Sequence, residues 1–335
     1  MNRPESSFSK GFCVRTPSHV RLLTAALVAA GLVLAGCGSD NSSSDTTGDS
    51  ASGTGNGWDT ASITGDVGTE ATVKFNGEVT DSTQTTKVLE EGEGDTVKQG
   101  DSLILQTVIA DGTTQKTVAS SYQDHQPQVV SLSDQVTKIF LDALSDKTIG
   151  SRVAVYAPAD QIFGPSGNPQ LGVSQKDPIL ILFDLIGKPL DKPDGKQHPA
   201  PSWAPKIEET KGVISGFDFA GTPKPDGKLH SATLYDGTGP VVKKGQTIFA
   251  RYLGEVYQGK KPFDENFSGT DPATFPIGTG SVIKGWDQSL VGQRVGSEVF
   301  LAIPPKYGYG TKGSPQAGIK GTDTLYFVVD IVGAA

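Results

Sequence analysis

Short apolar stretches, rather than long helical repeats, dominate the pattern of hydrophobic and polar positions along this chain. Residues 247–253, 298–303 and 324–332 are clear examples, and many such runs are bounded by Gly, Pro, Asp or Asn. Apolar runs between turn-forming residues are typical of β-strands. The run at 324–332 is apolar at successive positions, as expected for a strand buried on both faces. We therefore predict antiparallel sheets joined by turns as the main structure.

One segment, 281–292, has helical spacing instead. The apolar positions that share one helical face are Val282, Ile283, Trp286 and Leu290. Ser281 is a suitable N-cap, and Gly292 is a suitable residue to end the helix. One short helix lying against one antiparallel sheet predicts an α+β domain.

The pattern occurs twice along the chain. Residues 89–100 match residues 234–245 at an offset of 145, and residues 177–187 match residues 323–333 at an offset of 146. A nearly constant offset over this length indicates two copies of one domain. In the first copy, Phe140 stands at the position that Trp286 occupies in the second.

The repeat sets the expected boundaries of the domains. We predict a first domain over 63–188 and a second over 206–335, separated by a proline-rich linker at 189–205. Proline favours an extended, semi-rigid spacer. Trp203 lies in this linker, and its sequence context leaves open whether it docks on a domain or on a partner.

The N-terminus has the composition of an export signal. The basic residues Arg15 and Arg21 precede an apolar run at 22–34, which leads into the sequence LAGC ending at Cys37. This arrangement resembles a bacterial lipoprotein signal, in which the thiol of Cys37 would accept the lipid. A plain signal peptide or an anchor helix is the alternative.

We therefore expect a signal peptide at 1–36 and a lipid-anchored protein on the extracytoplasmic face of the cell membrane. Residues 37–62 are rich in Gly, Ser, Thr and Asp and contain almost no large apolar side chain. Such a segment cannot bury a core, so we predict a disordered tether there.

Cysteine and charge content restrict the chemistry of the chain. Only Cys13 and Cys37 are present, so the expected folded part has neither a disulfide nor a reactive thiol. Cleavage before Cys37 would change 29 basic and 37 acidic residues to 25 and 36, a net formal charge of −11. This charge argues against nucleic acid and against an anionic bilayer surface as partners, although acidity can also serve solubility alone.

Several motifs follow one another in the second copy. They are GKKPFD at 259–264, FPIG at 275–278, VIKGW at 282–286, VGS at 295–297, PPKYGYG at 304–310 and DTLYFVVD at 323–330. As a set they resemble the FKBP-type peptidyl-prolyl cis-trans isomerases. The resemblance implies two FKBP-like domains, each an antiparallel half-barrel sheet wrapped around one short helix. It also implies a pocket for proline-containing polypeptides that works without a metal or a cofactor.

The resemblance implies a role for particular residues. The expected catalytic residues are Tyr252, Phe263, Asp264, Ile283, Trp286 and Tyr309. The expected substrate-binding residues are Val282, Ile319 and Phe327. The indole of Trp286 would form the floor of the pocket, and Asp264 would lie near the Tyr252 hydroxyl. The Ile283 N–H and the Tyr309 hydroxyl would bind carbonyls of the peptide. A core tryptophan and an ordinary buried Tyr–Asp pair are the structural alternatives.

The expected function is isomerisation of X–Pro bonds in exported proteins. Amide resonance opposes rotation with a barrier of about 18–20 kcal/mol, and a dry pocket disfavours the charge-separated resonance form. A pocket that fits the twisted amide better than either planar isomer would accelerate the rotation. The alternative is a membrane-tethered chaperone or peptide-binding module without catalysis. A macrolide such as tacrolimus is a further expected ligand by resemblance.

The first copy departs from the motifs far more than the second. Thr107, Phe140 and Phe163 stand in place of Tyr252, Trp286 and Tyr309, and the Phe-Asp pair is absent from 119–122. We predict a degenerate, inactive first domain that either binds extended peptide or only spaces the second domain from the membrane. The second copy has its own departure, because Ala273 stands where the family often has another wall aromatic.

Overall fold

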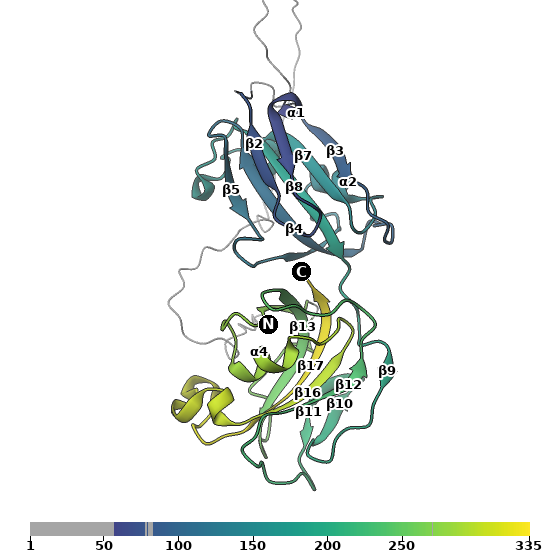
Figure 1. Cartoon of the computed structure of the whole chain (residues 1–335), viewed down its shortest axis with the longest axis vertical. Coiled ribbons are helices and arrows are strands. Elements are labelled where there is room, and N and C mark those ends of the chain that lie inside the picture. Colours follow the sequence, from purple (N-terminus) through teal and green to yellow (C-terminus); the bar gives the residue numbers. More distant parts are fainter. Residues whose placement is uncertain (1–56, 78, 80–82, 270) are drawn as a thin grey trace, which may run out of the picture.

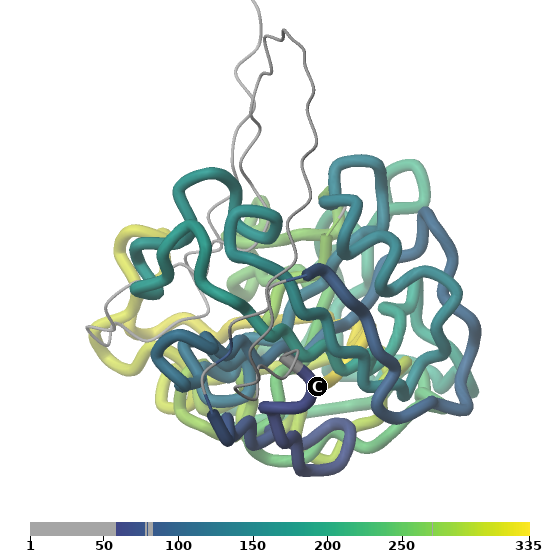
Figure 2. Tube along the Cα trace, turned by 90° about the horizontal axis from the view of Figure 1, so that it is seen from above, coloured from purple at the N-terminus to yellow at the C-terminus, as the bar shows by residue number. Residues whose placement is uncertain are grey.

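The structure, a computed structural model, describes residues 57–77, 79, 83–269 and 271–335. The expected signal peptide, the lipidation site Cys37 and the tether up to residue 56 lie outside these residues. The described part forms two α+β domains that are stacked along the long axis of the molecule (Figure 1). A view along that axis therefore superposes the two domains (Figure 2). No helix among the described residues is long and apolar enough to cross a membrane.

The first domain is a six-stranded antiparallel sheet around a short helix. Its strands are β3 (Thr85–Glu90), β4 (Ser102–Asp111), β5 (Lys116–Ser120), β6 (Gln128–Ser131), β7 (Arg152–Pro158) and β8 (Pro178–Gly187). They are arranged in the order β3-β7-β8-β4-β5, and β6 also pairs with β4. The helices are α2 (Lys138–Leu144), α3 (Ala159–Phe163) and the 3-10 turn η1 (Pro169–Leu171).

The second domain repeats this sheet. Its strands are β9 (Lys196–Gln197), β12 (His230–Asp236), β13 (Thr247–Val256), β14 (Asp264–Glu265), β15 (Ala273–Pro276), β16 (Glu298–Ile303) and β17 (Leu325–Ala334). The order is β14-β13-β17-β16-β12-β9, and β15 also pairs with β13. The helices are α4 (Lys284–Leu290) and the 3-10 turns η2 (Pro305–Tyr307), η3 (Gly310–Lys312) and η4 (Pro315–Ala317).

The repeat seen in the sequence is a repeat of structure. Strand β13 begins and ends 145 residues after β4, and helix α4 begins and ends 146 residues after α2. Each domain is a half-barrel whose inner face buries apolar side chains against its helix. The predicted α+β class with two copies of one domain is therefore confirmed.

A hairpin covers the outer face of each sheet, and the sequence analysis missed both. The hairpin of the first domain consists of β1 (Ala61–Thr64) and β2 (Thr72–Phe75), which follow α1 (Gly57–Thr60). The hairpin of the second domain consists of β10 (Lys206–Thr210) and β11 (Val213–Asp218). Apolar side chains from each hairpin pack on the sheet beneath it, so both faces of each sheet are buried.

These hairpins correct two of the expected boundaries. Residues 57–62, assigned to the tether, form α1 and the start of β1, and Trp58 packs 6.1 Å from Tyr156. Trp203, assigned to the linker, stacks on His230 at 5.3 Å and belongs to the outer core of the second domain. Trp58 and Trp203 stand 145 residues apart, so the repeat itself carried the signal that each domain begins earlier.

The linker is also more structured than proline content suggested. Strand β9, at Lys196–Gln197, pairs with β12 at the edge of the second sheet. Asp194 accepts hydrogen bonds from the backbone and the hydroxyl of Thr238, at 3.0 and 2.6 Å. Residues 189–205 therefore fold largely onto the second domain.

Helix α4 begins later than predicted. Ile283, not Ser281, is the N-cap residue, and no side chain caps the helix there. The carboxylate of Asp287 instead binds the preceding turn, accepting from the backbone N–H of Gly278 at 2.6 Å and of Gly280 at 2.9 Å. A carboxylate in the first turn also suits the positive end of the helix dipole.

The two domains touch through a small apolar cluster. Ile104 of β4 is buried with Phe249 of β13 and Val332 of β17. Gly333 permits this approach, because a Cβ there would lie 2.3 Å from Ile104 Cδ1. The Thr247 hydroxyl donates to the backbone oxygen of His125 at 2.8 Å and adds a polar contact beside the cluster.

Candidate active site

Trp286 lies at the centre of the inner core of the second domain. Its indole is surrounded by three rings in edge-on contact, at centroid distances of 5.5 Å to Tyr252, 4.9 Å to Phe275 and 5.5 Å to Phe327. Edge-to-face packing directs the positive edge of one ring at the negative face of the next. Helix α4 and strands β13, β15 and β17 thus meet around a single aromatic side chain.

The hydroxyl of Tyr252 is held by a carboxylate, as the resemblance implied. Tyr252 donates to Asp264 Oδ2 at 2.7 Å. Asp264 lies on β14, which pairs with β13 opposite Gly254. Asn266, which the sequence analysis did not single out, fixes this turn by accepting from the backbone N–H of Tyr252 at 2.7 Å and donating to Ala250 O at 3.0 Å.

A glycine near the C-terminal end of β13 makes room for the aromatic rings. A Cβ at Gly254 would lie 2.5 Å from Phe327 Cε1 and 2.6 Å from Phe263 Cζ. The two rings pack edge-on at 5.6 Å. Gly254 is therefore a site residue that the sequence analysis missed, and the available signal was a glycine inside an apolar strand.

The indole is closed off from solvent, which differs from the open floor that we expected. Trp286 has 0% relative exposure. The other expected contact residues on the inner face are also buried, namely Tyr252, Val282, Ile283, Ile319 and Phe327. The half-buried members are Phe263, Asp264 and Tyr309. These three form the rim, although the Tyr309 hydroxyl oxygen is itself buried, and the remaining residues support the rim from below.

Ile319 illustrates the difference. The sequence analysis expected it to bind substrate, but its backbone N–H donates to Ser314 O at 3.0 Å and its side chain packs in the inner core. The loop at 311–320 is folded inward as two 3-10 turns, so its one large apolar side chain is used for packing.

The buried indole N–H has no hydrogen-bond partner among the described residues. An unsatisfied buried donor costs about 1–3 kcal/mol. Apolar packing alone would be served as well by a phenylalanine, which carries no such donor. The first domain has that alternative, because Phe140 occupies the equivalent position on α2.

Strand register identifies the corresponding positions in the first domain. Ile109 pairs with Ala119 as Gly254 pairs with Asp264, so Val118 and Ala119 stand for the Phe-Asp pair. Thr107 pairs with Phe183 where Tyr252 pairs with Val329. The first domain therefore lacks the phenol, the carboxylate and the indole at these positions, and Ile109 stands where Gly254 makes room for two phenylalanine rings. No group of three or more His, Cys, Asp or Glu side chains in either described domain is arranged to hold a metal ion.

Comparison with known proteins assigns the second domain to a protein family. Residues 239–332 match the family model of the FKBP-type peptidyl-prolyl cis-trans isomerases. The FK506-binding protein of Streptomyces anulatus is 36% identical over 115 residues, which are 34% of this chain and 92% of that protein. The chain belongs to the FKBP-type peptidyl-prolyl cis-trans isomerase family.

Other FKBP relatives match over a part of their length. FK506-binding protein 4 of Aspergillus oryzae is 40% identical over 139 residues, 41% of this chain and 27% of that protein. This chain thus spans about a quarter of the length of that FKBP. The crystal structure of AtFKBP13 aligns at 36% identity with a TM-score of 0.30, covering 32% of this chain and 93% of that one.

Proposed function

We propose that the second domain isomerises X–Pro peptide bonds of exported polypeptides. The observation that carries the proposal is the Tyr252–Asp264 hydrogen bond beside the buried Trp286, since these groups are absent together from the first domain. A domain that served only as a scaffold would not need a phenol, a carboxylate and an unsatisfied indole around one helix.

The chemistry requires no covalent step. The proline ring would pack against the rim formed by Phe263, Asp264 and Tyr309, while the Ile283 N–H and the Tyr309 hydroxyl bind carbonyls of the chain. Because the surroundings are apolar, the charge-separated resonance form of the amide is disfavoured and rotation becomes easier. Every 1.4 kcal/mol of preference for the twisted amide raises the rate about tenfold.

The closed indole adds a step to this proposal. Since Trp286 has no exposed surface, a substrate reaches it only when the rim residues shift. A peptide carbonyl that then accepts from the indole N–H would relieve the unsatisfied donor, a gain available only in the complex.

Exchange NMR on a short Ala-Pro peptide with the full chain tests the activity. We expect acceleration by the parent chain and a loss of at least about tenfold in kcat/KM for Trp286→Leu and for Asp264→Asn. Phe140→Leu, the matched change on α2 of the first domain, should leave kcat/KM unchanged. Exchange no faster than in buffer would reject the isomerase, and an equal loss with Phe140→Leu would reject the assignment to the second domain.

We also propose that a macrolide such as tacrolimus binds at the same rim. Calorimetric titration of the full chain should show saturable binding that Phe263→Ala weakens. An absence of both heat and thermal stabilisation would exclude this ligand.

The proposed location is the extracytoplasmic face of the cell membrane, through a lipid on Cys37. The support is the LAGC sequence after an apolar run at the N-terminus. Mass spectrometry of the protein from a bacterial host should show a chain that begins at Cys37 and carries acyl groups, and Cys37→Ala should abolish both. An unacylated chain in the parent protein would exclude the anchor.

A further inference from the structure

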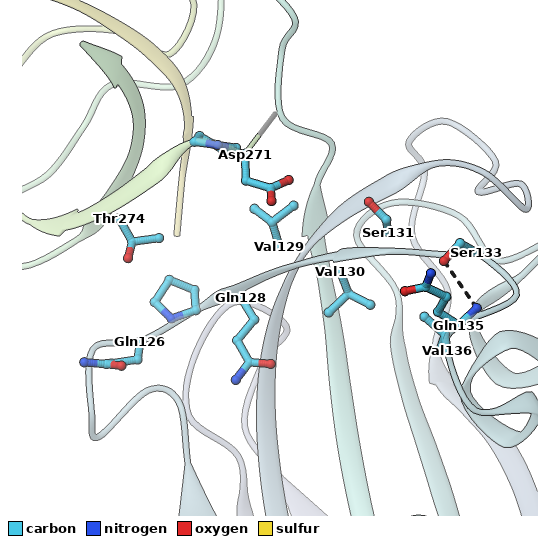
Figure 3. Close-up of a pocket in the computed structure, with 12 residues that line it drawn as sticks. Gln126, Gln128, Val129, Val130, Ser131, Ser133, Gln135, Val136, Asp271 and Thr274 are labelled. Carbon is cyan, nitrogen blue, oxygen red and sulfur yellow. Dashed lines mark hydrogen bonds between the residues drawn. The ribbon is translucent and has the colours of Figure 1, made fainter. Parts of the chain in front are cut away.

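A cavity of about 590 Å³ lies between the two domains, away from Trp286. The first domain lines it with consecutive residues Gln126–Ser131 and with Ser133, Gln135 and Val136, and the second domain adds Asp271, Pro272 and Thr274. Its volume lies within the range of about 300–1,000 Å³ that is usual for ligand pockets. Figure 3 shows Asp271 and Thr274 facing strand β6 across the cavity.

The lining places this cavity along the edge of β6. Successive side chains of a strand point to opposite faces of its sheet. Val129 and Val130 both line the cavity, and they lie on opposite sides of the strand (Figure 3). A space that touches both faces of one strand must run beside its edge. Within the described ranges β6 pairs with β4 alone, so this edge carries no neighbouring strand.

The hydrogen-bond pattern identifies the main-chain groups that point into the cavity. The Leu132 N–H donates to Asp101 O at 2.8 Å, and the register continues this pairing to Gln128. In an antiparallel ladder, alternate residues direct their main-chain groups to the same neighbour. Val130 therefore faces β4, whereas Val129 and Ser131 face away from it. The Ser131 oxygen is used by the Ser133 N–H at 2.8 Å, which leaves the Val129 N–H, the Val129 oxygen and the Ser131 N–H.

The equivalent edge of the second domain is blocked. There the Ile277 N–H donates to Gln246 O at 2.8 Å, so Thr274 and Pro276 of β15 face away from β13. Pro276 stands 145 residues after Ser131 and has no N–H. Proline on an edge strand prevents the addition of another strand. The first domain offers a donor where the second has none.

We propose that the cavity binds an extended segment of another polypeptide, which adds to β6 as a strand. Main-chain groups of β6 would hold the segment, as in other complexes formed by strand addition. Asp271 is the one charged side chain in the lining, so the segment is uncharged or basic. The four residues of β6 span roughly 13 Å, so the bound segment would pair with β6 over about four residues.

A second copy of this chain fits less well than an extended segment. In each copy the edge of β6 lies under Asp271, Pro272 and Thr274 of the same chain. Pairing β6 of one copy with β6 of another would bring the second-domain residues of both copies together at the same edge. An unfolded segment carries no such residues. The binding does not require proline and therefore does not depend on the proposed isomerase activity.

Titration of the full chain with acetyl-Thr-Val-Thr-Val-Lys-Thr-amide, which contains no proline, tests the proposal. We expect saturable binding by calorimetry and slower exchange of the Val129 and Ser131 amides. Two forms of the peptide, N-methylated at alternate amides, should differ, because only one set of amides faces β6. One should bind at least tenfold more weakly and the other nearly as well as the parent. No binding at millimolar peptide, or equal binding of the two forms, would overturn the proposal.

Variants of one residue separate the edge from the rest of the cavity. Ser131→Pro gives β6 the residue found at the equivalent position of β15, and binding should fall at least tenfold with an unchanged melting temperature. Ser131→Ala keeps the N–H and should bind like the parent. Equal binding by Ser131→Pro and Ser131→Ala would overturn the use of this edge. A dimer of the chain that Ser131→Pro dissociates would show that a second copy occupies the edge and would also overturn the proposal.

Discussion

In the second domain the central helix packs Gly285 against Ile303, and in the first domain the positions 146 residues earlier are Ile139 and Ala157, both buried in the inner core. A Cβ at Gly285 would lie 2.6 Å from Ile303 Cδ1. The larger side chain of the pair is therefore on the strand in the second domain and on the helix in the first. Volume is exchanged between neighbouring positions while the packing remains full. The comparison shows that this fold depends on the total volume at a contact rather than on which element supplies it.

The same exchange occurs around the aromatic residue of the helix. Trp286 packs 5.5 Å from Tyr252 on β13, whereas Phe140 packs 5.2 Å from Phe183 on β8. Thr107 and Val329 are the small partners in the two cases. Both cores are filled, but only the second arrangement leaves a phenol hydroxyl beside Asp264. Exchanging large and small side chains between strands keeps the core filled, but it removes the polar groups of the candidate site.

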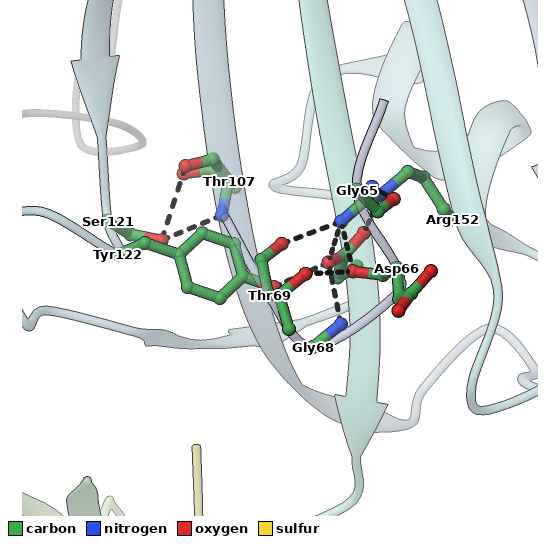
Figure 4. A network of polar contacts seen from close by, with 9 residues as sticks. Gly65, Asp66, Gly68, Thr69, Thr107, Ser121, Tyr122 and Arg152 are labelled. Atoms are coloured by element: carbon green, nitrogen blue, oxygen red, sulfur yellow. Dashed lines mark hydrogen bonds and ion pairs between the residues drawn. The ribbon is translucent and has the colours of Figure 1, made fainter. Parts of the chain in front are cut away.

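The outer faces differ in charge. In the first domain Arg152 pairs with Asp184 at 2.6 Å, and both side chains are nearly inaccessible. Figure 4 shows how Arg152 and Tyr122 approach the turn of the β1–β2 hairpin, where Arg152 also donates to Gly65 O, Asp66 O and Thr69 O. In the second domain the equivalent pair is Glu298 and Asp330, two buried carboxyl groups. The first hairpin is thus held by hydrogen bonds from an arginine that is paired with Asp184, whereas the matching positions of the second sheet hold two acids.

The largest expected effect comes from breaking the ion pair. Arg152→Met leaves Asp184 buried without its cation and removes the donor to three carbonyls of the hairpin turn. Such a change destabilises by about 3–5 kcal/mol. Hydrogen exchange resolved by mass spectrometry should show the loss in the first domain while exchange in the second is unchanged.

A paired variant distinguishes charge from packing in this test. Arg152→Met together with Asp184→Leu removes both charges and should be more stable than Arg152→Met alone. If the double variant is the less stable of the two, the hairpin depends on contacts other than the ion pair. Burial and the bond to Asp184 raise the pKa of the Tyr122 hydroxyl, so it remains a donor throughout the usual pH range.

The next largest effect is expected from replacing Gly254 with the isoleucine found at the equivalent position of the first domain. Gly254→Ile introduces the first-domain residue, and its Cβ would overlap Phe263 and Phe327. Because Phe327 is buried in the core, the half-buried Phe263 ring is the one that can leave. We expect kcat/KM to fall by about 100-fold, which corresponds to about 2.7 kcal/mol.

A double-variant cycle checks the cause. If Gly254→Ile acts by displacing Phe263, then Gly254→Ile combined with Phe263→Ala should be no less active than either single variant. Losses that multiply in the combined variant would show that the two positions act separately. Unimpaired activity of Gly254→Ile would show that the glycine is not needed for the site.

A smaller effect is expected from the acid pair of the second domain. Burial, and then the neighbouring Glu298, raise the pKa of Asp330 to about 9, and burial also raises the pKa of Glu298. The folded state therefore holds a proton that the unfolded state releases near pH 4. The second domain should lose stability as the pH rises from about 4 to about 9.

Asp330→Asn removes this titration and should stabilise the second domain at pH 8 by at least about 1 kcal/mol, with little effect at pH 4. Thermal unfolding at the two pH values measures the difference. Asp191→Asn removes the same charge from an exposed position and serves as the matched control. Identical pH profiles for Asp330→Asn and the parent would contradict a buried proton at this pair.

The sequence predicted the features that repeat and missed those that depend on contact across strands. The constant offset gave two domains, and the motif set gave the Tyr252–Asp264 pair. Gly254 and Asn266 belong to the site because of strand register, which the pattern of apolar residues does not specify. The closure of Trp286 depends on how three rings and a folded loop meet, and their order in the chain says nothing about that. The hairpins were missed because their strands are only four to six residues long, which is too short for a clear apolar pattern.

The smallest expected effect lies on the two helices themselves. On α2, Lys138 pairs with Asp142 at 2.7 Å, four residues apart and largely exposed, whereas α4 has Lys284 and Gln288 at the same places. An exposed pair of this spacing contributes about 0.3–0.5 kcal/mol, and salt screens it. Lys138→Ala should therefore destabilise the first domain by about 0.5 kcal/mol at low salt and by less at 1 M NaCl, as measured by urea unfolding. Lys284→Ala should show no comparable dependence on salt, because its helix offers no carboxylate at that spacing. A larger loss in the second domain would mean that Lys284 serves the neighbouring site rather than the helix.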